Sequence, residues 1–203
     1  MEFDPAPLRL AELTHDTVLA HLARDPRLLL PVGGFGGEDS LPIGWRSLLV
    51  SRMADDCSAA LGWLRAPTIA FGTTDARGRR APWSARPRTL QRFVNDLLMS
   101  AEALGVAEVL VLTARASEAQ LDALATVHAR RALIRVIDIL PAGALGISAA
   151  QDAQALGAII ERLALPLTVP SVGDAPAYGV LRQRVLSALH AHRSATSLHR
   201  RAS

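Results

Sequence analysis

The sequence predicts a three-layer α/β/α fold built on a mainly parallel sheet. Short apolar segments alternate with longer helical patterns, as in parallel sheets that are covered by helices on both faces. The apolar run at 28–32 contains no polar residue, which is typical of a strand buried on both faces. The 203 residues suffice for one such domain, so we expect a single domain over 1–192 and a basic, flexible tail at 193–203.

The other elements follow from hydrophobic periodicity and from capping residues. Thr14 is the expected N-cap of the first helix, Pro87 suits a first helical turn, and Gly105 suits a helix end. Helices are predicted at about 14–24, 45–64, 87–104, 117–130, 148–162 and 177–192. Further strands are predicted at 67–71, 108–112 and 132–140, with a short one at 167–169.

Composition narrows the classes of function. All 22 basic residues are arginine, which we interpret as genome bias of a bacterial type, and the net charge is only +3. Few aromatic residues are available to stack on bases, so binding to nucleic acid is disfavoured. No apolar run is as long as a membrane span, and the N-terminus does not resemble a signal peptide. The single cysteine, Cys57, fits a reducing compartment, so we expect a cytoplasmic protein in which this thiol is buried.

A glycine-rich loop follows the first predicted strand, and the chain is organised around it. Four glycines fall within residues 33–37, and ligands of parallel α/β sheets bind at the carboxyl ends of strands. The loop does not match a dinucleotide fingerprint, because Asp39 stands where the third glycine would be. A phosphate-binding nest is an alternative, but Glu38 and Asp39 would repel the anion, so we favour a flexible loop without a ligand.

The motifs around this loop resemble those of the creatininase family of metal-dependent amidohydrolases. The similar segments are Leu-Ala-Glu-Leu-Thr at 10–14, Leu-Pro-Val-Gly at 30–33, Leu-Pro-Ile-Gly at 41–44 and Asp-Ile-Leu-Pro-Ala-Gly at 138–143. With the order of the strands, the resemblance covers about residues 10–160. It implies a creatininase-like fold and, in an active member, a two-metal centre that activates water to cleave an amide.

The resemblance also implies which residues occupy the metal-ligand positions. These positions fall on Gly36, Glu38, Arg46, Arg115 and Gln154. Only Glu38 among them is a metal ligand, and the two arginines would repel a cation. No histidine lies in the loops directly after the strands predicted at 28–32, 67–71, 108–112 and 132–140. We therefore expect a degenerate family member with no metal, no cofactor and no catalytic residue.

Two functions remain open at this point. The first is a non-catalytic, metal-free creatininase-like protein, a pseudoenzyme that serves as a structural or regulatory subunit of an enzyme complex. The alternative is an amide- or peptide-bond hydrolase of the same family with a rebuilt active site. Arg46, Arg77 and Arg115 are candidates to contact an anionic ligand, or to form ion pairs with nearby carboxylates, and we favour the ion pairs.

The expected partner is another copy of the chain or a related active subunit, in a homo- or hetero-oligomer, and neither nucleic acid nor a membrane. Trp83 lies in a long polar loop that offers little core to cover an indole. Because exposed aromatic side chains are enriched at interface cores, we predict that Trp83 contacts another subunit. Trp63, late in an amphipathic helix, is expected in the core of its own subunit.

Overall fold

The computed structural model describes residues 6–35, 43–73, 83–114, 118–139, 178–179, 181–183, 185–187 and 189–190. The backbone forms two compact units, residues 1–141 and 142–203. The single domain expected over 1–192 stays a prediction. The tail at 193–203 and the elements predicted at 148–162 and 167–169 lie outside the described residues.

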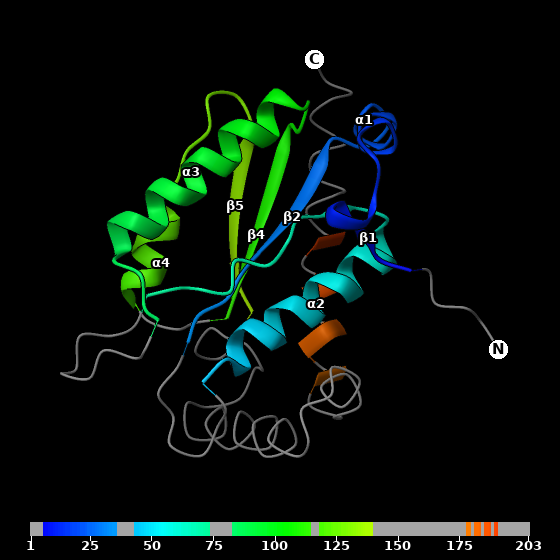
Figure 1. The fold of residues 1–203 in the computed structure, drawn as a ribbon. Coiled ribbons are helices and arrows are strands. Elements are labelled where there is room, and N and C mark those ends of the chain that lie inside the picture. The colour runs from blue at the N-terminus through cyan, green and yellow to red at the C-terminus, as the bar shows by residue number, and fades with distance from the viewer. Residues whose placement is uncertain are drawn as a thin grey trace. The chain divides into compact units, whose positions relative to one another are not determined.

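The first unit contains a five-stranded sheet whose paired strands are all parallel (Figure 1). Its strands are β1 (Leu8–Arg9), β2 (Arg27–Val32), β3 (Leu64–Arg65), β4 (Glu108–Thr113) and β5 (Leu133–Asp138). They lie side by side in the order β1-β3-β2-β4-β5. β4 pairs over six residues with both β2 and β5, whereas β3 pairs over two residues with β1 and with β2.

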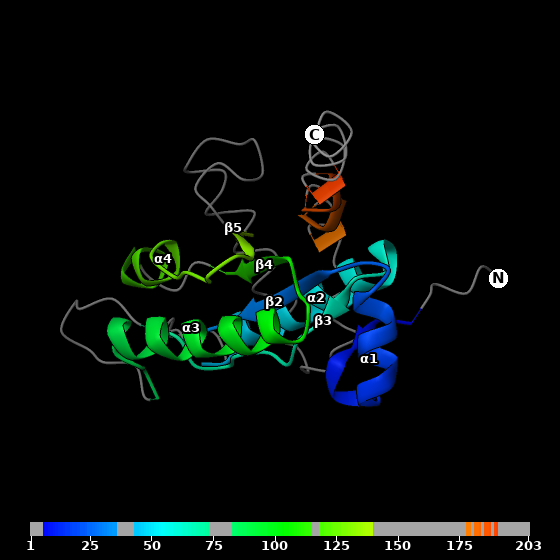
Figure 2. The same cartoon turned by 90° about the horizontal axis from the view of Figure 1, so that it is seen from above.

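Helices cover both faces of this sheet, as predicted. They are α1 (His15–Leu22), α2 (Trp45–Leu61), α3 (Pro87–Ala103) and α4 (Glu118–Ala125), with a 3₁₀ helix, η1, at Leu10–Glu12. The connection through α2 leads from β2 toward β1, and the connection through α3 leads back across β2 to β4. Because such crossovers are right-handed, α2 and α3 lie on opposite faces. Figure 2 shows α1 and α3 on the same side of the sheet.

The core follows the alternation of side chains along the strands. Leu28, Leu30 and Val32 of β2 pack in one cluster with buried residues of α1, α3 and α4. Leu29, the alternate residue of β2, is fully buried on the other face, which explains why residues 28–32 of this strand include no polar side chain. Trp63 is 2% exposed and Cys57 is fully buried, so both predictions of burial are confirmed.

Helix boundaries follow the capping residues closely. The hydroxyl of Thr14 accepts a hydrogen bond from the backbone N–H of Thr17, 3.3 Å away, which confirms Thr14 as an N-cap. The predicted helix at 45–64 was too long, because Gly62 adopts a left-handed conformation (φ 68°) and ends α2 at Leu61. Gly105, also at positive φ, follows the end of α3.

The strand predicted at 67–71 is wrong, and Pro31 explains why. The paired strand is β3, and within 67–71 only Ile69 forms a bridge, to Val32. On this side of β2, Leu29 accepts from the N–H of Ala66, and Gly33 donates to the carbonyl of Ile69. Pro31, between these two positions, accepts from the N–H of Ile69 at 2.9 Å but has no N–H to donate, so the ladder loses one bond at Pro31.

The described residues of the second unit confirm part of the helix predicted at 177–192. Residues 178–179, 181–183, 185–187 and 189–190 are helical. Tyr178, Leu181, Val185 and Leu189 are buried and recur at intervals of three or four residues, as on one face of a helix. No helix in the described parts of either unit is long and apolar enough to cross a membrane.

Candidate functional site

The ends of β2 and β4 mark the expected ligand site of this fold. The two strands are neighbours, yet the chain leaves β2 toward β3 and leaves β4 in the opposite direction, toward β5. Ligands of open α/β sheets bind outside the carboxyl ends of strands at such a reversal. We call this region, formed by residues 33–35, 45–47, 69–73, 113–114 and the first turn of α4, the carboxyl edge.

Gln120 fills the centre of the carboxyl edge. Its side chain is fully buried, and its Nε2 donates to the carbonyl oxygen of Gly33 and to the hydroxyl of Thr113, both at 2.9 Å. Its Oε1 accepts from the backbone N–H of Thr73, also at 2.9 Å. One amide therefore joins the end of β2, the end of β4 and the segment that follows β3.

Ser47 has a similar role in the first turn of α2. Its hydroxyl accepts from the backbone N–H of Gly34 at 3.1 Å and lies 2.8 Å from the carbonyl oxygen of Ala70, to which it donates. The N–H of Gly33 donates to Ile69 at 2.8 Å. The first two N–H groups of the glycine loop are thus bonded within the protein, which argues against a phosphate nest at these two positions.

Two glycines permit the close packing of this region. A Cβ atom on Gly33 would overlap the backbone and side chain of Ser47. A Cβ atom on Gly72 would overlap the amide of Gln120 and the carbonyl oxygen of Gly33. Neither glycine has a positive φ, so both are needed for space and not for backbone conformation. At these positions the carboxyl edge is packed with protein atoms.

Aromatic rings lie next to this polar cluster. Phe35 and Phe71 are stacked, with ring centroids 5.4 Å apart, and Phe71 is 51% exposed. Trp45 is buried at the start of α2, and the guanidinium carbon of Arg46 lies 4.8 Å from the centroid of its ring. Arg46, a predicted degenerate-site position and anion contact, thus forms a cation–π contact at the carboxyl edge.

The other predicted site positions are not placed by the structure. Gly36, Glu38, Arg77, Arg115 and Gln154 lie outside the described residues. Their convergence with Arg46 and the predicted ion pairs stay predictions. Trp83 is described: its side chain is 72% exposed, and its φ of 66° is unusual for a large side chain.

The described residues of the carboxyl edge do not fit a two-metal centre. Such a centre needs several carboxylate or imidazole ligands that converge on each ion. Ser47 and Gln120 are neutral, and their polar atoms already bond to the backbone. Within the described ranges, no group of three or more His, Cys, Asp or Glu residues could hold a metal.

Two charged groups with shifted pKa values lie on the β1 side of the sheet. Asp55 of α2 pairs with Arg9 of β1 at 3.0 Å and with Arg65 of β3 at 3.1 Å. Hydrogen bonds to Asp55, and then to Glu12, raise the pKa of Arg9. Burial lowers the pKa of Arg65, and the charge of Asp55 opposes that shift. These pairs fasten α2 to the short strands and are structural.

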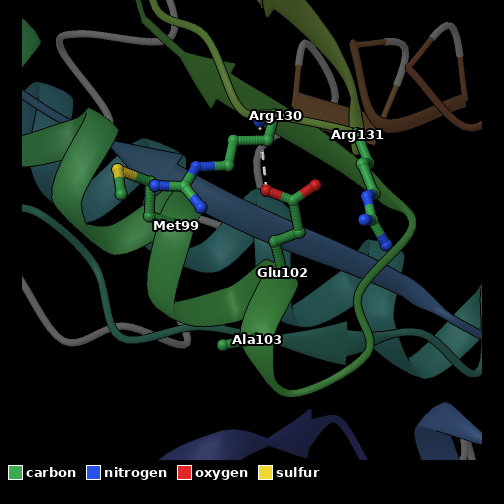
Figure 3. A pocket seen from close by; sticks show the side chains of 5 residues that line it. All are labelled: Met99, Glu102, Ala103, Arg130 and Arg131. Atoms are coloured by element: carbon green, nitrogen blue, oxygen red, sulfur yellow. Dashed lines mark hydrogen bonds between the residues drawn. The ribbon is translucent and has the colours of Figure 1, made fainter.

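A shallow pocket of about 400 Å³ lies beyond the opposite end of the sheet (Figure 3). Met99, Glu102 and Ala103, near the end of α3, line it together with Arg130 and Arg131, which precede β5. The carboxylate of Glu102 accepts from the backbone N–H groups of Arg130 and Ala132, at 3.0 and 3.1 Å. This carboxylate holds the loop before β5, and its negative charge among the pocket residues would repel an anion.

Comparison with known proteins rests on structure. No sequence-family profile matches the chain, and no curated protein matches it by sequence. The structure matches that of creatinine amidohydrolase (creatininase) with a TM-score of 0.67, over 92% of this chain and 98% of that chain. The chain has a creatininase-like fold.

Further solved structures give the same result. One, described as "Creatininase Mn", and another, a mutant creatininase complexed with creatine, each match with a TM-score of 0.69 over 92% of this chain and 98% of theirs. Sequence identity is 14% to creatinine amidohydrolase and 13% to these two. At this identity the likeness concerns the creatininase-like fold alone, which confirms the predicted architecture.

Gln120 and Ser47 were not among the site residues predicted from the sequence. Gln120 lies in the first turn of α4, and its side chain reaches across to the ends of β2 and β4. A usable signal was present, because each residue lies in the first turn of the helix that follows a central strand. In a creatininase-like fold, that turn faces the carboxyl ends of the strands.

Proposed function

We propose that this creatininase-like chain is a non-catalytic, metal-free subunit with a structural or regulatory role in an enzyme complex. The observation that supports the proposal is the buried Gln120 amide, which bonds to Gly33, Thr113 and Thr73 where ligands of this fold class bind. Its donors and acceptor serve the protein's own backbone and a hydroxyl. The described centre of the carboxyl edge therefore resembles a packed core.

The charges expected around this centre support the same proposal. Arg46 and Arg115 occupy positions where the family resemblance implies metal ligands, and Gly36 has no side chain to offer. A cation at such a position opposes metal binding by repulsion, whereas a neutral residue would only weaken it. Of these three, Arg46 lies in the described part of the chain, where it stacks on Trp45.

Metal content and amide hydrolysis test this proposal directly. We expect the purified chain to contain no stoichiometric zinc, manganese or iron by elemental analysis, before or after incubation with each metal and dialysis. We also expect no hydrolysis of creatinine or of small linear amides above the buffer blank. Stoichiometric metal, or turnover that chelation abolishes, would contradict the proposal. Metal-independent turnover would favour the rebuilt hydrolase.

A partner subunit is part of the same proposal, and Trp83 is its proposed contact. The indole is largely exposed and held at positive φ just before α3, so little of the chain itself covers it. Burying an aromatic side chain of this size contributes roughly 2–3 kcal/mol, which favours association. The proposed partner is another copy of the chain or a related active subunit.

A further inference from the structure

An apolar groove of about 450 Å³ runs along α3. Figure 2 shows that α3 lies on the same face of the sheet as α1. The floor of the groove is formed by buried residues of the core, among them Leu28, Leu30 and Ala66. Its walls are formed by large apolar side chains that remain exposed, namely Phe71, Phe93, Leu97 and Leu104. The groove does not include Gln120 or Ser47, and it meets the carboxyl edge at Ile69, Ala70 and Phe71.

The exposed apolar area in this groove is large for a free surface. Phe71 and Phe93 are each about half exposed, at 51% and 50%. An aromatic side chain buries about 150–250 Å² when fully covered, so these two rings alone leave on the order of 200 Å² in water. Leu97 and Leu104 extend the area along the helix. Contiguous apolar surface of this kind marks interaction sites.

The charges beside the groove show which partner fits it. Arg92 and Asp96 are exposed on α3 and stand four residues apart, next to Phe93 and Leu97. If a second α3 packs antiparallel across the first, Arg92 of each copy faces Asp96 of the other. The midpoint of this charged pair is residue 94 and that of Phe93 and Leu97 is residue 95, about 1.5 Å apart along the helix. One two-fold axis therefore satisfies both pairs.

We propose that this groove is an interface between two copies of the chain, related by a two-fold axis that crosses α3 near residues 94 and 95. Such a contact is isologous, so the same apolar patch is buried twice and each ion pair occurs twice. Phe93 of one copy enters the groove of the other beside Leu97. The interface is independent of the proposed lack of catalysis, because an active hydrolase could pair in the same way.

Charge reversal tests this geometry. The full chain is examined by sedimentation equilibrium over roughly 1–100 µM, a range suited to micromolar dissociation constants. Wild type is expected to dimerise, and Arg92→Asp or Asp96→Arg alone to weaken the dimer roughly tenfold or more, because like charges then face each other twice. The double variant Arg92→Asp/Asp96→Arg is expected to regain the wild-type constant. Arg131→Asp makes the same charge change at an exposed residue of the loop before β5, outside the groove, and is expected to leave it unaltered.

Other outcomes overturn the proposal. A chain that is monomeric over the whole range has no such interface, and a dimer indifferent to Arg92→Asp and to Phe93→Ser pairs through another surface. A double variant that stays as weak as the single ones would exclude the reciprocal geometry. Because all four charged variants change exposed side chains, circular dichroism should show that each is folded. The sedimentation measurement does not depend on metal content or amide turnover. Its outcome is therefore independent of the test of the proposed function.

Discussion

Gln120 shows how one side chain can determine whether a site is open or packed. Its amide has two donors and an acceptor in use between elements that are distant in sequence. We predict that Gln120→Ala lowers the free energy of unfolding by about 2–4 kcal/mol, because buried backbone groups lose their partners. Gln91→Ala is the matched control, since Gln91 bonds Thr126 at an exposed site and should cost under about 1 kcal/mol.

Urea denaturation of the two variants measures both values. Equal losses would show that the Gln120 bonds are not buried and would weaken the description of the carboxyl edge as packed.

Gly72 offers a second test at the residue scale. Gly72→Ala places a methyl group against the amide of Gln120 and the carbonyl oxygen of Gly33, and we expect a loss of about 2–3 kcal/mol from overpacking. Gly179→Ala is the control, because Gly179 is helical and a Cβ atom there meets no atom within 4 Å. That substitution should be neutral or stabilising by up to about 1 kcal/mol. Thermal unfolding of both variants distinguishes these outcomes, and a stable Gly72→Ala protein would show that the edge has room.

At the residue scale the sequence predicted more of the fold than of the site. The N-cap Thr14, buried Trp63 and buried Cys57 each follow from local pattern, because neighbours in sequence determine them. Gln120 bonds Gly33 at a separation of 87 residues, and no local pattern contains that pairing. Long-range polar contacts of this kind are visible only after the strands are in register.

At the scale of elements, Asp55 links α2 to both short strands of the sheet. We predict that Asp55→Asn lowers the free energy of unfolding by about 3 kcal/mol, because the buried Arg65 guanidinium loses its carboxylate. Glu12→Gln is the matched control: it also removes a carboxylate from Arg9, but at an exposed site, and should cost under about 1 kcal/mol.

Guanidinium chloride would screen these charges, so the two variants are best compared in urea. If Glu12→Gln costs as much as Asp55→Asn, the burial of the Asp55 pairs does not determine their effect.

The elements also show where sequence patterns fail. The central strands were predicted because their apolar runs are continuous, and β2 and β4 are observed within one residue of those bounds. The segment 67–71 has a similar composition, yet it follows the Pro31 gap in the β2 ladder and pairs only at Ile69. A strand requires a partner, and the missing N–H of that partner lies 36 residues earlier in sequence.

At the scale of the whole molecule, substitution of Trp83 tests whether the chain associates with another subunit. We predict that Trp83→Ala weakens association with a partner subunit or a second copy, because it removes an indole that is 72% exposed in the single chain and that the partner would bury. Sedimentation velocity of wild type and variant, alone and with any co-encoded creatininase-like protein, measures the effect. A chain that is monomeric in every mixture, with no change on substitution, would contradict it.

The charge-reversal variants of α3 serve as a reference for this measurement. If Trp83→Ala and Arg92→Asp weaken the same dimer, one surface contains both residues. If only one of the two substitutions weakens the dimer, Trp83 and Arg92 belong to different contacts.

The unequal pairing of the strands has a consequence for the dynamics of the sheet. β4 is hydrogen-bonded on both sides over six residues, whereas β1 and β3 are held by two residue pairs at each contact. Local opening requires few bonds to break at the β1–β3 side and many at β4. In hydrogen–deuterium exchange, amides of Val109–Val111 should therefore be the slowest, and those near Leu64 should exchange sooner. The creatininase-like sheet is thus expected to open from the side that Asp55 fastens.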